Sequence, residues 1–199
     1  MATFVTNHLE PYDALTSNLS RKPLTGKSVL VTGASRGVGD YIARSIAGAG
    51  AAKVGILGRD QKRVEDTKAR LAKDYPSTKF LAYSANITDE SAVAAVFKDF
   101  GVPDVLINNA GVFPDDGPFI SQDLTRWWSG FATNILGTAT VTQKYLQAKA
   151  PGAPGIVLNC STFAAHFRVP LVGWSGVSLI SHKAVTISPF DGRLPRLLY

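Results

Sequence analysis

A glycine-rich turn between a strand and a helix constrains the fold of this chain more than any other sequence feature. In KSVLVTGASRGVG (residues 27–39), residues 28–31 form the continuous apolar run typical of a strand buried on both faces. Glycines follow this run at once, and a helical pattern begins at the last of them. A strand that passes through glycines directly into a helix is typical of α/β folds in which the turn approaches a ligand.

The same alternation continues along the chain. Apolar runs at 27–33, 53–57, 79–85, 103–111 and 155–161 alternate with helical patterns at 39–52, 60–74, 88–100 and 121–150. Thr88 is the expected N-cap of the third helix. Strands that alternate with helices predict right-handed crossovers and a parallel sheet covered on both faces. The predicted fold is α/β, a doubly wound parallel sheet of the Rossmann type, incomplete at its C-terminal edge.

The length of 199 residues fits one domain with a sizeable core. We expect a polar N-terminal arm at 1–22, a dinucleotide-binding domain at 23–187 and an irregular tail at 188–199. The arm lacks the apolar centre of a signal peptide, and no apolar run is long enough to cross a bilayer. The single cysteine, Cys160, is expected to act as a small buried hydrophobic residue. Because one thiol cannot form an internal disulfide, it points to a reducing compartment, and a cytoplasmic location is expected.

The formal net charge is +6, but the basic residues are not clustered. Between residues 58 and 76 they alternate with acidic ones, as expected of a solvated helix face. This pattern gives little support to nucleic-acid binding. An anionic small molecule fits the charge better, and no metal-ligand spacing surrounds His166.

The turn TGASRGVG (residues 32–39) suits a pyrophosphate. Gly33 can adopt the positive φ of a tight exit from the strand, Gly37 lets a phosphate approach the backbone, and Gly39 permits close helix–sheet packing. The free amides at the start of the helix then face the anion with the favourable end of the helix dipole. The sequence therefore predicts a dinucleotide site at this turn.

From about Leu24 to Lys183 the sequence resembles the short-chain dehydrogenase/reductase family. The motifs TGASRGVG, NNAG (108–111), TNILG (133–137) and NCS (159–161) occur in that family's order. The resemblance implies hydride transfer between a nicotinamide cofactor and a small-molecule carbonyl or alcohol. It assigns catalytic roles to Asn134, Ser161 and Lys183. It assigns cofactor binding to Gly33, Ser35, Arg36, Gly37, Val38, Gly39, Arg59, Asn86, Ile87, Asn108, Ala110, Gly111 and Lys183.

The choice of cofactor depends on the end of the second strand, ILGRD. Folds that select NAD usually place an acid there, where this chain has Gly58 followed by Arg59. The guanidiniums of Arg59 and Arg36 would pair with a 2′-phosphate, so NADP is favoured over NAD. The alternative is that Arg59 only opens a solvated helix. Asn86 stands where the family usually has an aspartate at the adenine, and an amide can partly replace it.

The family's catalytic tyrosine has no counterpart. The resemblance implies a tyrosine four residues before the lysine, whose ammonium lowers the pKa of the phenol. With Lys183 as that lysine the position holds Leu179, and the other register places Trp174 there. Loss of a general acid typically costs about 10²–10⁴-fold in rate. An active reductase, a dinucleotide-binding module without turnover, and a truncated inactive product therefore all remain open.

The C-terminal sequence departs from the family in a second way. Pro189, Pro195 and Asp191-Gly192 break any helix, so the fifth strand is expected to form an exposed apolar edge. One hypothesis is that residues from about 177 come from a shifted reading frame, an unspliced intron or a divergent gene. The helical surface that relatives use to form homo-oligomers would be incomplete.

Aromatic residues fall into two groups. Trp127, Trp128 and Phe131 recur at helical spacing, which favours core packing over substrate stacking. A second group follows the fourth and fifth strands, where α/β folds form clefts, and suggests an apolar or aromatic substrate: Phe113, Phe163, Phe167 and Trp174.

Overall fold

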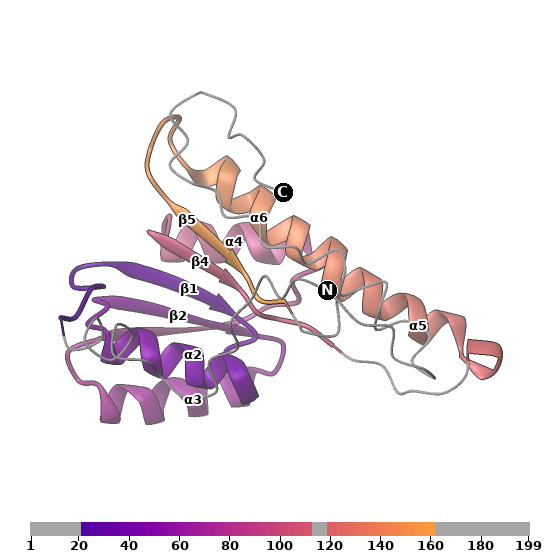
Figure 1. Cartoon of the computed structure of the whole chain (residues 1–199), viewed down its shortest axis with the longest axis horizontal. Helices are drawn as coiled ribbons and strands as arrows, with labels where there is room; N and C mark the ends of the chain where they lie inside the picture. The colour runs from indigo at the N-terminus through magenta and orange to yellow at the C-terminus, as the bar shows by residue number, and fades with distance from the viewer. Residues whose placement is uncertain (1–20, 113–118, 162–199) are drawn as a thin grey trace, which may run out of the picture.

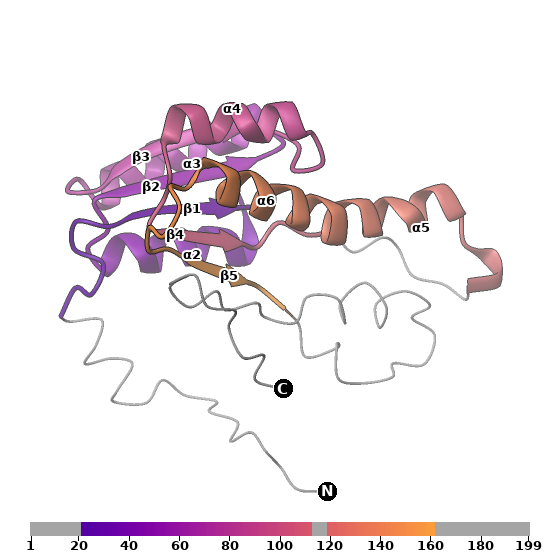
Figure 2. The ribbon, with the colours of Figure 1, turned by 90° about the horizontal axis from the view of Figure 1, so that it is seen from above.

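A computed structural model of the chain describes residues 21–112 and 119–161. Its centre is a parallel sheet with the order β3-β2-β1-β4-β5. Figure 2 shows β3 and β5 at the two edges of this sheet. The doubly wound parallel architecture expected from the sequence is confirmed. The strands are β1 (Ser28–Thr32), β2 (Lys53–Gly58), β3 (Lys79–Ser84), β4 (Val105–Asn108) and β5 (Ile156–Asn159).

The helices lie in two layers. In Figure 1, α2 (Gly37–Gly48) and α3 (Gln61–Asp74) lie below the sheet, and α4 (Glu90–Phe100) and α6 (Thr138–Ala148) lie above it. A short 3₁₀ turn, η1 (Phe119–Ser121), precedes α5 (Leu124–Phe131). Because the chain winds in one direction from β1 to β3 and in the other from β4 to β5, the order reverses between β1 and β4. This reversal is the topological switch point at which such sheets bind ligands.

Each face of the sheet has its own core. Val29, Val31, Val54 and Ile56 point towards α2 and α3. On the other face, Leu30, Leu57, Leu106 and Val157 pack with the apolar residues of α4 and α6. Because β1, β2 and β4 are covered on both sides, they read as continuous apolar runs rather than alternating ones, as the sequence predicts.

The start of α4 differs from the prediction by one residue. The N-cap is Asp89, not Thr88, because the Asp89 carboxylate accepts hydrogen bonds from the amides of Ser91 and Ala92. These bonds, with the Ser91 hydroxyl, lower the pKa of Asp89. Thr88 instead donates its own amide to the side chain of Asn86 at 3.2 Å, in the turn before the helix.

The long helix predicted at 121–150 contains an irregular central segment. A π-helical stretch, η2 (Ala132–Gly137), joins α5 to α6. Figures 1 and 2 show α5 extending well beyond the sheet. Core packing is therefore wrong for Trp128, which is 62% exposed on α5, whereas Trp127 and Phe131 are half-buried.

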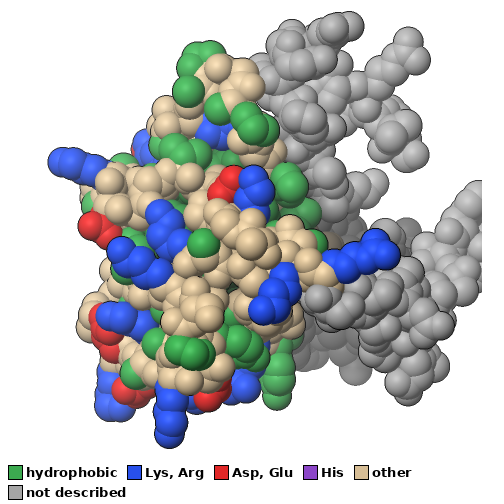
Figure 3. Space-filling view, turned by 90° about the vertical axis from the view of Figure 1, so that its left-hand side faces the viewer, with side chains coloured by type: hydrophobic (Ala, Val, Ile, Leu, Met, Phe, Trp, Pro, Cys, Tyr) green, Lys and Arg blue, Asp and Glu red, His purple; other side chains and the backbone are tan. Residues whose placement is uncertain are grey.

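Charged side chains are dispersed over the surface. On the face at the amino ends of the strands, Lys and Arg lie between hydrophobic, neutral and acidic surface (Figure 3). The predicted solvated face of α3 is confirmed by the surface pairs Lys62–Asp66 and Lys68–Glu65. In the two described ranges, no helix is long and apolar enough to cross a membrane.

The described sheet ends at β5, which pairs only with β4 among the described strands. Ile156 and Leu158 are 45% and 43% exposed, in agreement with the expected apolar edge. The arm up to residue 20 and all residues after 161 lie outside the described part. They include Lys183, both candidate tyrosine positions and the tail.

Candidate functional site

A cavity of about 890 Å³ opens at the carboxyl ends of β1, β2 and β4. The loops that follow these strands form most of its wall, with further residues from the β3–α4 loop and η2. This is the position at which the reversal of strand order leaves a crevice. The lining residues are Gly33, Ser35, Arg36, Gly37, Val38, Gly39, Leu57, Gly58, Arg59, Asp60, Arg63, Ala85, Ile87, Asn109, Ala110, Gly111, Val112 and Thr133.

The glycines of the β1–α2 turn are required by its geometry. Gly33 and Gly37 have φ of +67° and +56°, a region that side chains other than glycine rarely adopt. A Cβ at Gly33 would lie 2.7 Å from the Cα of Ala110, and one at Gly39 would overlap the Gly33 carbonyl. Nothing lies within 4 Å of a Cβ built at Gly37, so that side of the turn is open. At its glycines the turn therefore exposes backbone to the cavity.

The amino end of α2 is uncapped. Its N-cap, Arg36, makes no side-chain capping bond. By contrast, α3, α4 and α5 are capped by the carboxylates of Asp60, Asp89 and Asp123. Of these four helices, only α2 begins at the cavity with its first amides open to an anion. This donor set fits a pyrophosphate.

Residues of the NNAG motif hold the turn in place. The Thr32 hydroxyl accepts hydrogen bonds from the amides of Asn109 and Ala110, both at 3.0 Å. The Asn109 side chain donates to the carbonyls of Thr32 and Gly33 at 3.0 and 3.2 Å. Asn109 also lines the cavity. Asn109 was not among the site residues expected from the sequence.

Asn108 lies elsewhere. Its side chain is 3% exposed and donates to Thr142 on α6 and Asn159 on β5, at 3.0 and 2.8 Å. It is not among the cavity-lining residues. The structure therefore places Asn108 as a link between β4, β5 and α6, whereas its neighbours Ala110 and Gly111 do line the cavity.

Asn134 lies in η2 next to Thr133, which lines the cavity. Its buried amide makes two bonds to the backbone of Val112: Oδ1 accepts from the amide and Nδ2 donates to the carbonyl, both at 2.9 Å. Single π-helical segments often occur at functional sites. Asn134 therefore fixes the segment after β4 against the long helix.

Ser161 is exposed and follows Cys160, whose amide extends the β4–β5 pairing by donating to the Asn108 carbonyl at 2.8 Å. Burial raises the pKa of the Cys160 thiol, which disfavours a reactive thiolate. Ser161 is not among the cavity-lining residues, so the structure does not bring it together with the glycine turn. Lys183 and the four residues suggested for an aromatic substrate site lie outside the described residues.

The β1–α2 turn and the chain after β2 together supply the basic side of the cavity. Arg36 and Arg59, the two arginines predicted to favour NADP, both line it, together with Asp60 and Arg63, which were not among the predicted site residues. A Cβ at Gly58 would lie 2.9 Å from the Ser35 hydroxyl and 3.0 Å from Val64, so an acid does not fit there. Asn86 is not among the lining residues, although Ala85 and Ile87 on either side are.

A tyrosine and a lysine four residues apart do occur at the C-terminal end of α6, with the lysine as its C-cap, but at the wrong end of the sheet. Tyr145 is 1% exposed, and its hydroxyl lies against Gly155, before β5 begins. Burial and the charge of Asp104 raise the pKa of this phenol. Lys149 donates its ammonium to the carbonyl of Ala153. This pair therefore lacks both the position and the lowered pKa of a catalytic phenol.

The fold and the glycine turn define a Rossmann-type α/β protein. Comparison with known proteins then gives the family. The sequence profile described as short chain dehydrogenase matches residues 27–175. The chain belongs to this family, whose members are generally oxidoreductases that bind NAD(P).

Individual relatives agree with this assignment. The chain is 31% identical to the short chain dehydrogenase/reductase AacuD of Aspergillus aculeatus over 87% of its own length and 60% of that protein. It is 35% identical to the short chain dehydrogenase tazN of Aspergillus terreus, over 78% of its own length and 35% of that protein. The chain thus spans about 60% or less of these two relatives.

A solved structure has the same fold. A 3-oxoacyl-(acyl-carrier protein) reductase with bound NAD from Brucella melitensis superimposes with a TM-score of 0.75 at 23% identity. The match covers 87% of this chain and 67% of that one.

Proposed function

We propose that this chain binds NADP(H) in the cavity at the β1–α2 turn and belongs to a reductase or dehydrogenase that acts on a carbonyl or alcohol. The observation that carries the proposal is the uncapped amino end of α2, which opens through a glycine-rich turn onto a cavity of about 890 Å³. Backbone amides there suit the diphosphate, because they point along the favourable end of the helix dipole.

Each group of residues has a proposed part. Gly33, Gly37 and Gly39 admit the diphosphate, with Ser35 and Val38 beside it. Ala110, Gly111 and Ile87 form the apolar wall, and Arg36 and Arg59 favour NADP over NAD because a guanidinium pairs with a 2′-phosphate. When bound, the cofactor supplies the hydride, so the chain has to supply orientation and a proton.

The proton source decides between turnover and binding alone. In the proposal Asn134 positions the segment after β4, Ser161 holds the substrate oxygen and Lys183 binds the cofactor ribose. None of the tyrosines in the described ranges lines the cavity. This observation favours a second candidate, a dinucleotide-binding module without efficient turnover.

Ligand binding and turnover can be measured on the same purified chain. A ligand that binds only the folded state at 100 times its Kd stabilises it by about 2.7 kcal/mol. For a chain of this size we therefore expect NADPH to raise Tm by about 5–10 °C. Adding aromatic ketones and aldehydes under the same conditions then tests turnover. A Tm rise without NADPH consumption supports the binding module; a folded chain with no response to millimolar NADPH or NADH contradicts both candidates.

A further inference from the structure

One side of the cavity, formed by Arg36 of the β1–α2 turn and by the residues that follow β2, carries an excess of positive charge. Arg36, Arg59 and Arg63 supply three guanidinium groups, and Asp60 supplies the one carboxylate that lines the cavity in the described ranges. A phosphate monoester carries about −1.5 to −2 charges at neutral pH. The charge of this wall therefore matches a phosphate monoester, such as the one on the adenosine ribose of NADP.

Asp60 is already engaged by the chain. Its Oδ1 accepts the Arg63 amide at 3.1 Å, which caps α3, and its Oδ2 lies 3.2 Å from Nε of Arg63. The Asp60 charge is thus offset within α3 rather than directed at a ligand. The same contact holds Arg63 through Nε, which leaves both terminal nitrogens of its guanidinium without a bond to another residue of the described part.

The helix face on which Arg63 lies is also fixed. Thr67, one turn further along α3, is 5% exposed and donates its hydroxyl to the carbonyl of Ser35 at 3.3 Å. Residues four apart lie on the same face of a helix. Arg63 therefore lies on the face of α3 that meets the glycine turn, at the cavity end.

We propose that Arg63 is a specificity-determining residue that binds the 2′-phosphate of NADP directly, with Asp60 holding its side chain in place. The proposal rests on the proposed function, because it requires that the cavity bind a dinucleotide. It adds a residue from the first turn of α3 to the two arginines expected from the sequence. The Asp60–Arg63 pair is half exposed, at 50% and 54%, so a ligand can reach the terminal nitrogens of Arg63 without unpacking the core.

The test is a set of binding titrations on the full chain, with NADPH, NADH, adenosine 2′,5′-bisphosphate and AMP as probes. Arg63→Gln is compared with Lys62→Gln, which removes a neighbouring cation that pairs with Asp66 away from the cavity. Loss of one charge-assisted contact at a half-exposed site is expected to raise the Kd for the 2′-phosphorylated probes about tenfold. Binding of NADH and AMP, and the Tm of the free protein, should stay within about twofold and about 2 °C of the unsubstituted chain.

A double substitution separates direct contact from simple charge neutralisation. Asn is as good an N-cap as Asp, so Asp60→Asn keeps α3 intact while removing the carboxylate. If Arg63 binds the phosphate, Asp60→Asn/Arg63→Gln remains weak towards NADPH. Three results would each overturn the inference. They are recovery of NADPH affinity in the double variant, unchanged NADPH binding by Arg63→Gln, and equal affinity of the unsubstituted chain for NADPH and NADH. A folded chain that binds neither dinucleotide nor adenosine phosphate would instead overturn the proposed function itself.

Discussion

At the scale of single residues, Gly39 is the position in the glycine turn that has least room for a side chain. A Cβ there would overlap the Gly33 carbonyl and lie 2.5 Å from the Asn109 side chain, which holds the turn. We expect Gly39→Ala to lower the free energy of unfolding by about 1–3 kcal/mol, because the turn and α2 must move apart. Urea denaturation measures the change, and NADPH titration measures the accompanying loss of binding.

Gly48→Ala is the matched control, since it makes the same substitution in the same helix. Its Cβ would meet only Tyr75, at 3.9 Å. Alanine has the higher helix propensity, so this variant should be equal to or more stable than the unsubstituted chain by up to about 1 kcal/mol. If both variants lose stability equally, the close approach at Gly39 is not the cause.

The role of the turn glycines could be predicted from the sequence because it depends on the conformation of the turn itself. The sequence does not distinguish Asn108 from Asn109. These neighbours point to opposite sides of a strand end that is covered on both faces, so only the assembled sheet shows which side chain reaches the cavity. Arg63 was missed for the same reason, because its place depends on how Thr67 contacts the Ser35 carbonyl.

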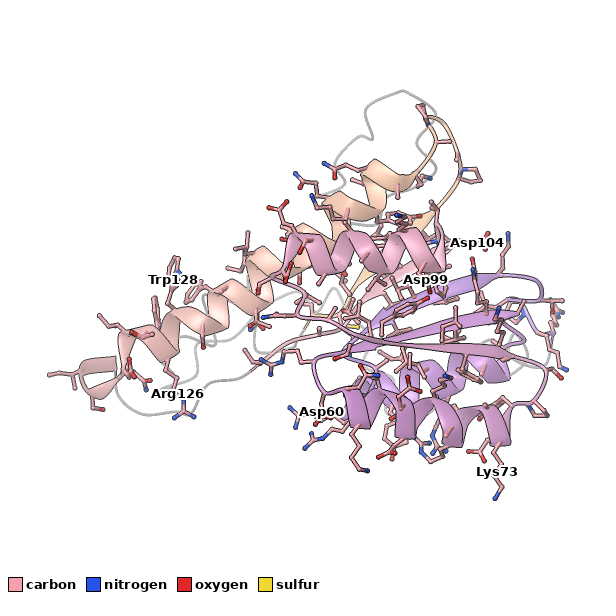
Figure 4. All side chains as sticks on the ribbon, turned by 180° about the vertical axis from the view of Figure 1, so that it is seen from behind. Asp60, Lys73, Asp99, Asp104, Arg126 and Trp128 are labelled. Carbon is pink, nitrogen blue, oxygen red and sulfur yellow. The ribbon has the colours of Figure 1, made fainter. Side chains whose placement is uncertain are left out.

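At the scale of elements, the junction between β1 and β4 depends on one carboxylate. Asp104 precedes β4 and lies at the end of the sheet far from α5 (Figure 4). It accepts hydrogen bonds from the amide and the hydroxyl of Ser28, both at 2.8 Å, and from the Lys27 ammonium at 3.1 Å. Burial alone would raise the pKa of Asp104, but these bonds outweigh it and lower the pKa below 3.8.

Because the pKa of Asp104 is lower in the folded state, its stabilising effect is present above pH 3.8 and is lost as the pH falls through the folded-state value. The carboxylate is 39% exposed, so we expect Asp104→Asn to lower the free energy of unfolding by only about 1 kcal/mol at pH 7. The difference between variant and parent should shrink below pH 3.8. Urea titrations across this range measure it. Asp66→Asn, at a surface pair, is the control, and a gap that persists in acid would contradict the assignment.

Element types were easier to predict than element details. The apolar runs and helical patterns are strong enough to identify the strands and helices that the structure describes. The N-cap of α4 could not be chosen from sequence, because Thr88 and Asp89 are both good caps and the Asn86 turn decides between them. The π-helical segment at 132–137 has no sequence pattern of its own, and only the structure shows it, with Asn134 of this segment in contact with Val112.

At the scale of the whole molecule, the two ends of the sheet have different roles. The carboxyl ends of the strands form the cavity. At the amino ends, Asp104 accepts the Ser28 amide and its charge acts on the Tyr145 hydroxyl. The parallel topology was predictable from the alternation of elements, and with it the position of the cavity. The sequence left the catalytic completeness of the site open, because neither register holds a tyrosine, and these positions and Lys183 lie outside the described ranges.

This separation of the two ends predicts that the Tyr145–Lys149 pair takes no part in function. The Tyr145 hydroxyl is buried and has no hydrogen-bond partner among residues 21–112 and 119–161, so Tyr145→Phe removes an unsatisfied group while keeping the ring against Phe97. The free energy of unfolding should rise or change by less than about 0.5 kcal/mol. Tyr83→Phe is the matched control, since it breaks a 2.6 Å bond to Asp99 and should cost about 0.5–1.5 kcal/mol.

NADPH affinity, and any turnover of the parent chain, should be the same in Tyr145→Phe. A variant that still bound NADPH but lost turnover would make Tyr145 the proton donor, and would require this end of α6 to reach the cavity.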